Sequence, residues 1–467
     1  MNNVHVNLSM LRAIFYVFSA SLLLCGALLW NDISLLIPFG LVFLVLLVVG
    51  MLTGAIVLWR LSAGSSLILV SATVVAIDLG MQVHGSIFLV IKGALYCLAL
   101  VIGIRDLQRT KDFGFTNGML FLAYAIFAWM TVFLAKFPLA LLHTGLALVS
   151  LAFVAIAIER ATPSQAISIV GWIAKLIGAG CAVSILLYFA LPTLVIAQNV
   201  AGEGRSGGIF GSPNSFGAVS AIGVLASIGA YLAARKKTEP GVWFILLCAL
   251  CSGGLLFSGS RTALVGLLMS LSLCALLYKP KIVLSVALIA LGTAFLLDIF
   301  NLLDTLLSEM QLLVSRNQYG DDVRTLTGRL PIWNFAFNAW LDEPFLGFGL
   351  GESRRVMTEG WRFRWGGTTE TAHNLILESL LNVGLVGTLM LIGIVLRAIA
   401  TAWRIRAEGV AQFPALYFVS CAFISFGVLQ GITEKSFGGT ASVSTGALVV
   451  ALGCFTLIKR RGSIERH

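Results

Sequence analysis

Long apolar stretches recur from near the start of the chain to near its end, with short polar segments between them. A helix needs about 20 consecutive apolar residues to cross a bilayer, and this criterion gives about fourteen candidate spans, or about twelve if neighbouring runs are re-entrant. The candidate spans are centred near Cys25, Leu46, Val74, Leu95, Tyr124, Leu148, Ala182, Leu225, Leu250, Leu271, Leu291, Met390, Ile424 and Val450. Lipid offers no partners to backbone polar groups, so each span must be helical. The pattern therefore predicts an all-α polytopic integral membrane protein.

Composition excludes the soluble protein classes. Hydrophobic residues make up 58% of the 467 positions and charged residues 11%, and the mean hydropathy is +0.97. A soluble fold could not bury this much apolar surface. The first apolar run, residues 11–29, is too long for the apolar part of a signal peptide and is followed by further spans. We therefore expect it to be a retained first helix.

The distribution of basic residues predicts the orientation of the chain. The sequence has 31 Lys and Arg against 21 Asp and Glu, a formal net charge of +10, and most of the basic residues fall in alternate loops and in the two tails. Basic loops face the cytoplasm, so we expect both termini to be cytoplasmic. The opposite short loops hold only Lys136, Arg205, Arg261 and Lys435. The net charge is thus a signal of topology, and we expect no nucleic-acid partner.

One long segment breaks the pattern of short loops and divides the chain into three parts. Residues 301–372 are polar and rich in Arg and Trp, and the topology puts them outside. A loop of that length is uncommon unless it is functional. Residues 331–341 have the pattern of a short amphipathic helix, so we expect the loop to be partly helical over the membrane face. The helices of residues 1–300, with Arg205 and Arg261 in outer loops, precede it, and those of 373–467, with a cytoplasmic tail, follow it.

Two arginines in outer loops are candidates for binding an anion. Arg205 lies in a glycine-rich stretch just before a helix that Ser212 or Asn214 could cap, and a helix N-terminus beside a guanidinium suits a phosphate. Arg261 begins an apolar helix at the same face. The alternative is that each arginine anchors its helix at the membrane interface by snorkelling. Two arginines on one face favour a doubly negative group such as a pyrophosphate.

Arg329 and Trp333 stand four residues apart in the long loop, and therefore on one face of a helix. A guanidinium beside an indole suits a sugar or a lipid phosphate, and it suits a structural cation–π pair equally well. Closely spaced glycines follow at positions 347, 349 and 351, and we expect them to set the backbone geometry of the loop. Arg329 and Trp333 are therefore candidate substrate-binding residues.

His373 is the strongest catalytic candidate, because it stands where the long loop re-enters the membrane. A neutral histidine can take a proton from a hydroxyl group. Asn374 follows it, and Glu378 comes about one helical turn deeper. An acid at that depth is costly, so we expect Glu378 to have a task, either as a residue that orients His373 or as a structural acid. No outer cluster of Asp, His or Cys has the spacing of metal ligands, so we expect no metal and no cofactor.

Four short motifs lie in the second half of the chain. The first is the loop-to-helix pattern H-[NSQ]-x9-G-x-x-[GTY], formed by His373, Asn374, Gly384 and Gly387. The others are S-R-T-A-L with Arg261, G-R-x-x-x-W at Gly328, Arg329 and Trp333, and G-x-G-x-G at Gly347, Gly349 and Gly351. Together with the topology, these motifs resemble the O-antigen ligase and polymerase superfamily of bacterial membrane glycosyltransferases.

The resemblance implies a GT-C-like glycosyltransferase of the bacterial inner membrane, with its active site on the periplasmic face. The donor would be an undecaprenyl-pyrophosphate-linked glycan, transferred with inversion and without a metal. His373 would act as general base on the acceptor hydroxyl, while Arg205 and Arg261 would hold the pyrophosphate and stabilise the charge that develops as it leaves. Acceptor phosphates could bind Arg329 and, from charge alone, Arg354, Arg355, Arg362 and Arg364.

Within the superfamily, the long outer loop favours an O-antigen ligase of lipopolysaccharide biosynthesis, because a surface rich in Arg and Trp suits lipid A–core, a bulky and phosphorylated acceptor. An O-antigen polymerase and a protein O-oligosaccharyltransferase would use the same donor and are the alternatives. A polysaccharide flippase or transporter is a more distant one, since it needs charges along a path through the membrane. The candidates for such a path, Asp78, Lys92 and Lys175, do not form an evident chain.

Overall fold

The computed structural model describes residues 71–75, 78, 92–93, 95–96, 99–100, 115–198, 204–234, 241–278, 329–365 and 369–464. The predicted spans near Cys25, Leu46 and Leu291 lie outside these residues, and those near Val74 and Leu95 lie mostly outside them. The other nine predicted spans each fall on an observed helix.

The described part of the chain is built from long apolar helices. They are α5 (Asn117–Thr131), α6 (Pro138–Arg160), α7 (Pro163–Ala190), α9 (Pro213–Ala234), α10 (Val242–Ser258), α11 (Arg261–Tyr278), α17 (Leu375–Arg404), α19 (Pro414–Gly431) and α20 (Val443–Ile464). Eight of the helices in these described ranges are long and apolar enough to cross a membrane, and α10 is a shorter apolar helix. The prediction of an all-α, multi-pass membrane protein is confirmed.

The shorter elements lie between these helices. They are η2 (Val132–Leu134), α8 (Pro192–Val195), β1 (Ile196–Gln198), β2 (Gly204–Ser206), η3 (Gly208–Phe210), α15 (Arg329–Trp340), α16 (Ser353–Trp365) and α18 (Arg406–Gln412). The strands β1 and β2 form one small antiparallel hairpin, in which Ala197 pairs with Arg205. The helix predicted at residues 331–341 corresponds to α15, and α16 follows it within the same long segment.

Local sequence determines where several helices begin. Thr162 and Gln165 form a reciprocal capping box at the start of α7, and Pro163 takes the first helical position, where its missing N–H costs nothing. Asn374 caps α17 by accepting hydrogen bonds from the N–H groups of Ile376 and Leu377. Of the two residues expected to cap α9, Ser212 accepts the N–H of Ser215 at 3.1 Å, as a cap does.

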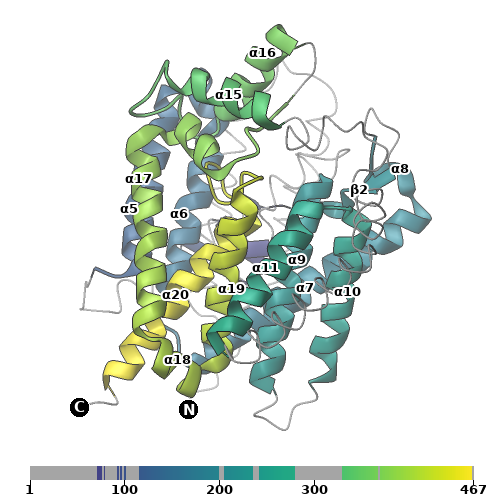
Figure 1. Ribbon diagram of the computed structural model, residues 1–467, viewed down its shortest axis with the longest axis vertical. Helices are drawn as coiled ribbons and strands as arrows, with labels where there is room; N and C mark the ends of the chain where they lie inside the picture. Colours follow the sequence, from purple (N-terminus) through teal and green to yellow (C-terminus); the bar gives the residue numbers. More distant parts are fainter. Residues whose placement is uncertain are drawn as a thin grey trace, which may run out of the picture.

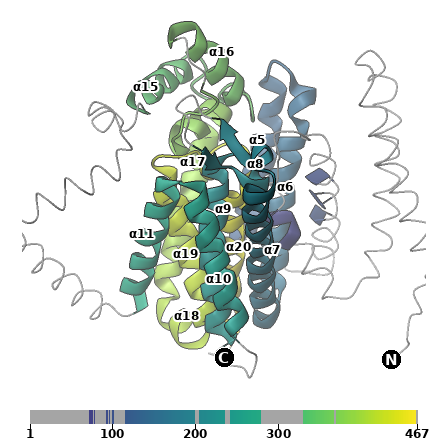
Figure 2. The ribbon, with the colours of Figure 1, turned by 90° about the vertical axis from the view of Figure 1, so that its right-hand side faces the viewer.

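The long helices run side by side, and the shorter elements lie at their ends (Figure 1). α9, α19 and α20 are the most buried of the candidate spans, so they form the centre of the bundle. α15 and α16 lie across one end, above the start of α17, and α18 lies at the other end; Figure 2 shows the same arrangement from the side. We call the end with α15 and α16 the pocket face, because the cavity described below opens there.

A kink in α17 joins the bundle to the long loop. Gly384 interrupts this helix with φ 63°, a conformation that favours glycine. The loop backbone crosses at the kink, where Phe348 N donates to Leu381 O at 2.8 Å and Val386 N donates to Phe345 O at 3.2 Å. A Cβ on Gly384 would lie 2.3 Å from Phe345 O, and one on Gly347 would lie 2.7 Å from Gly384 N. Gly347 is one of the three closely spaced glycines expected to set the backbone geometry of the loop, and all three have a positive φ.

Candidate active site

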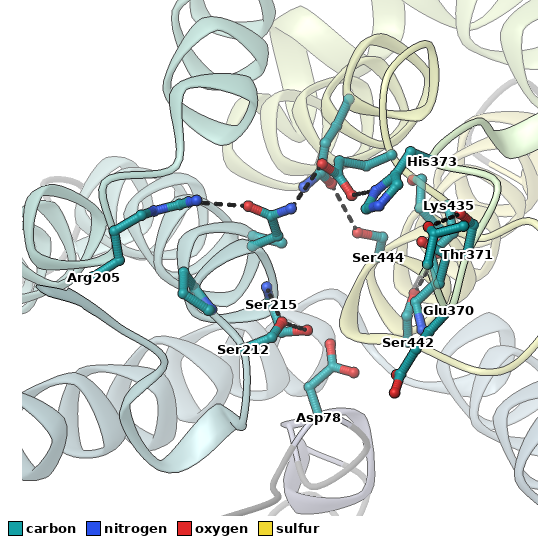
Figure 3. Close-up of a pocket in the computed structure, with 17 residues that line it drawn as sticks. Asp78, Arg205, Ser212, Ser215, Glu370, Thr371, His373, Lys435, Ser442 and Ser444 are labelled. Carbon is teal, nitrogen blue, oxygen red and sulfur yellow. Dashed lines mark hydrogen bonds and ion pairs between the residues drawn. The ribbon is translucent and has the colours of Figure 1, made fainter. Parts of the chain in front are cut away.

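A cavity of about 390 Å³ opens at the pocket face and brings together segments that are far apart in the sequence. Its lining includes Asp78, Arg205 and Asn214 from the first half of the chain, and His373, Glu434 and Lys435 from the second half. Figure 3 labels Asp78, Arg205, His373 and Lys435 around the cavity. Arg205 and His373, which were predicted separately, thus line the same cavity.

His373 lies in the turn before α17, and its imidazole is bonded to a carboxylate. Its Nδ1 lies 3.1 Å from Oε2 of Glu434, and the side chain is 28% exposed. A neutral imidazole that donates its Nδ1 proton to this carboxylate keeps Nε2 as the proton acceptor. The His373 backbone has φ 48°, a conformation uncommon for residues other than glycine. The surrounding contacts therefore hold this residue against a local preference of the backbone.

Glu434, between α19 and α20, is the centre of the hydrogen-bond network. Its Oε1 accepts from Arg329 at 2.8 Å and from Asn214 Nδ2 at 2.9 Å, while its Oε2 faces His373. The side chain is only 9% exposed. Burying a carboxylate is costly unless charge and hydrogen bonds compensate it, and these partners supply both. The network therefore fixes the imidazole relative to three separate segments of the chain.

Arg205 extends the same network to the other side of the cavity. Its position on β2 is fixed by the hairpin, its Nε donates to Ser258 O at 3.2 Å, and its terminal nitrogen donates to Asn214 Oδ1 at 3.1 Å. A continuous chain of hydrogen bonds thus runs from Arg205 through Asn214 and Glu434 to His373 (Figure 3). A guanidinium and a histidine facing one cavity could bind an anionic group and accept a proton beside it.

Arg329 and Trp333 reach this network from α15. Arg329 forms the ion pair with Glu434, and Trp333 Nε1 donates to the backbone oxygen of His373 at 3.3 Å. Both residues therefore contact the residues that define the imidazole position. Their direct contact with a substrate stays a prediction.

Comparison with protein families bears on this part of the chain. Residues 246–392 match the model of a family described as O-antigen ligase. This match supports assignment of the chain to the O-antigen ligase family. No curated protein matches the chain. The match agrees with the resemblance found in the motifs, and it supports O-antigen ligation or polymerisation as the general function and a glycosyltransferase-like ligase as the kind of enzyme.

The O-antigen ligase match covers part of the candidate site. It includes Arg261, Arg329, Trp333 and His373, whereas Arg205 and Glu434 lie outside it. Arg261 begins α11 at the pocket face, but it is not among the described residues that line the cavity. Its predicted contact with a pyrophosphate stays a prediction.

Asn374 and Glu378 lie beside His373 and contact protein groups. Asn374 caps α17 and donates from Nδ2 to Ile432 O at 3.0 Å, next to the segment that holds Glu434. Glu378 is buried, and it accepts the backbone N–H of Ala372 at 3.0 Å and the hydroxyl of Ser353 at 2.7 Å. Its link to His373 thus runs through the backbone of the preceding residue. Their contact with substrate stays a prediction.

The arginines of α16 have acidic neighbours in the part of the chain that the structure describes. Arg354 pairs with Glu370 at 2.7 Å, and Arg355 pairs with Glu359 at 2.8 Å and with Glu352. The side chains of Arg362 and Arg364 lie outside the described residues. Binding of acceptor phosphates by these arginines stays a prediction. No group of three or more His, Cys, Asp or Glu in the described ranges could hold a metal ion.

The sequence patterns did not identify two residues of the candidate site. Glu434 is the acid of the short segment G-I-T-E-K, at the end of an apolar run and beside Lys435. Asp78, a candidate for a charged path through the membrane in the sequence, lines the cavity in the structure. An acid next to an apolar span is costly and therefore suspect, and that signal could have found both.

Proposed function

We propose that the protein is an O-antigen ligase that transfers an undecaprenyl-pyrophosphate-linked glycan to a sugar hydroxyl of lipid A–core. The reaction inverts the anomeric centre and uses no metal. The observation that carries the proposal is the pairing of His373 with Glu434 in the cavity that Arg205 also lines. We place the cavity on the periplasmic side of a bacterial inner membrane, with both termini in the cytoplasm, because the basic loops predict that orientation.

The proposed chemistry is a single displacement. The acceptor hydroxyl oxygen attacks the anomeric carbon, and its proton passes to Nε2 of His373. The bond from that carbon to the pyrophosphate oxygen breaks, and the pyrophosphate leaves with the electron pair. Glu434 stabilises the imidazolium as it forms, in the role that a buried carboxylate plays beside a catalytic histidine.

The leaving group requires positive charge, since the pyrophosphate gains negative charge in the transition state. Arg205 lines the cavity, and Arg261 begins a helix at the same face, so we assign both to the pyrophosphate. Arg329 and Trp333 contact Glu434 and the His373 backbone, which supports a role in positioning the base. Asn374 and Glu378 would support the same turn.

The decisive test is deletion of the gene, followed by gel analysis of lipopolysaccharide and of carrier-linked glycans, with complementation by wild type and His373→Ala. A ligase predicts long glycans stranded on the carrier while lipid A–core stays bare. Complementation by wild type but not by a normally inserted His373→Ala protein supports the base. Single repeats on the core would instead identify a polymerase, and a fully functional His373→Ala protein would contradict the mechanism.

A further inference from the structure

Asp78 places a carboxylate in the wall of the cavity, far in sequence from the other lining residues. Its Oδ2 accepts the backbone N–H of Val443, the first residue of α20, at 2.9 Å. Figure 3 shows the carboxylate directed toward the cavity interior, and Lys435 lines the same cavity. The mechanism proposed above gives neither of these charged groups a task.

The chemistry of this wall differs from that of the Arg205 side. A carboxylate accepts hydrogen bonds from hydroxyl groups, and an ammonium donates to hydroxyl or ring oxygens. A small number of such groups on a cavity wall orients a ligand and provides specificity. Asp78 and Lys435 therefore suit a ligand that carries several hydroxyl groups, such as a sugar ring.

The reaction geometry indicates which sugar this would be. In an inverting displacement, the leaving group and the attacking oxygen lie on opposite sides of the anomeric carbon. If the pyrophosphate lies at Arg205 and the acceptor oxygen at His373, the ring of the reacting sugar must extend in a third direction. Figure 3 shows Arg205, His373 and Asp78 at three different sides of the cavity.

We propose that Asp78 and Lys435 form the subsite for the donor sugar whose anomeric carbon reacts. This inference rests on the proposed function and adds the residues that would recognise the transferred glycan. The competing explanation is that Asp78 only caps α20. An Asp78→Asn variant separates the two, because an amide oxygen still accepts the Val443 N–H while the charge on the cavity wall is lost.

The test compares equilibrium binding of two ligands to the purified full chain in lipid nanodiscs. The first ligand is the carrier-linked glycan extracted from cells that lack the gene, and the second is undecaprenyl pyrophosphate without a sugar. Asp78→Asn should weaken binding of the first by about tenfold, the effect of losing hydrogen bonds to a charged group, and leave the second within about twofold. Equal weakening of both ligands, or no change in either, would overturn the subsite.

Glu159→Gln is the matched control. Glu159 is also a carboxylate that accepts a backbone N–H at the start of a helix, from Gly118 of α5 at 2.7 Å. It is not among the described residues that line the cavity. This variant should leave the ratio of the two affinities unchanged, and a sugar-selective loss here would also overturn the subsite.

Arg205→Ala makes failure of the subsite distinguishable from failure of the proposed function. Removing the pyrophosphate contact should weaken both ligands by the same factor. Unchanged binding of both would contradict the proposed role of Arg205 while leaving a selective effect at Asp78 intact. A wild-type protein that binds neither ligand would overturn the proposed function, and the subsite with it.

Discussion

Two buried glutamates lie near His373, and they have different surroundings. Glu434 lines the cavity, and its carboxylate contacts three side chains, those of Arg329, Asn214 and His373. Glu378 accepts from the Ser353 hydroxyl and the Ala372 backbone, groups that hold the long loop against α17. The same residue type thus serves the proposed chemistry in one place and the architecture in the other. The difference lies in whether the carboxylate contacts the imidazole or the chain that carries it.

The strongest test of this comparison is Glu434→Gln. The amide cannot stabilise a protonated His373, so we expect the rate of glycan transfer to fall by about a hundredfold to ten-thousandfold, the range typical of a lost acid–base contribution. The fall should appear in kcat more than in KM, because the missing interaction belongs to the transition state. Initial rates of transfer from purified donor measure it. Wild-type activity would remove Glu434 from the mechanism.

Gly384→Ala tests the close crossing of the long loop and α17, the same two segments that the Glu378 hydrogen bonds hold together. The added Cβ would lie 2.3 Å from Phe345 O, at a residue with φ 63°. Strain and overpacking together should lower the free energy of unfolding by about 3 kcal/mol. Gly393→Ala in the same helix is the control, since no other segment of the described chain comes within 4 Å of the place that its added methyl group would take. Thermal unfolding in detergent should separate the two variants, and equal stability would contradict the close crossing at the kink.

Glu378→Gln should have a smaller effect, mainly on stability. One of its two carboxylate oxygens becomes an NH₂ group, which leaves either the Ser353 hydroxyl or the Ala372 N–H without its acceptor and costs about 2 kcal/mol. The free energy of unfolding measures this loss. Transfer measured well below the unfolding temperature should keep most of its kcat. Complete loss of transfer in a protein of wild-type stability would instead give Glu378 a direct role in catalysis.

Much of the fold follows from the sequence because a single apolar run that crosses lipid must satisfy its own backbone hydrogen bonds and is therefore helical. The helix α15 was predictable for a different reason, since its pattern depends on residues that are neighbours in sequence. The partners of Glu434 were not predictable in this way, because Asn214, Arg329 and His373 are 220, 105 and 61 positions away from it in sequence. Patterns within one segment carry no information about such distant pairs.

The position of the candidate base could be predicted, but what holds it could not. His373 stands out by its place between loop and helix, and Arg205 by its glycine-rich surroundings, and the structure brings both to one cavity. The kink at Gly384 and the contact of Asp78 with α20 depend on the crossing of separate segments. Such crossings are fixed by three-dimensional packing, which an amino-acid pattern along one helix does not encode.

The smallest expected effect is that of a change at Trp333, which donates a hydrogen bond to the backbone of His373. Trp333→Phe keeps an aromatic ring but removes the Nε1 donor that bonds to His373 O at 3.3 Å. Losing one neutral hydrogen bond costs about 1 kcal/mol, so kcat should fall about fivefold if that bond holds the imidazole in place.

Trp340→Phe is the matched control, because Trp340 lies in the same helix and donates in the same way, to Pro344 O at 2.9 Å. It should cost similar stability, measured by thermal unfolding, and leave kcat unchanged, since its acceptor belongs to the loop and not to the residue that carries the base. If both variants lower kcat equally, the effect comes from the stability of α15 as a whole. A fall confined to Trp333→Phe would mean that the hydrogen bond to the His373 backbone contributes to the rate by holding the imidazole in place.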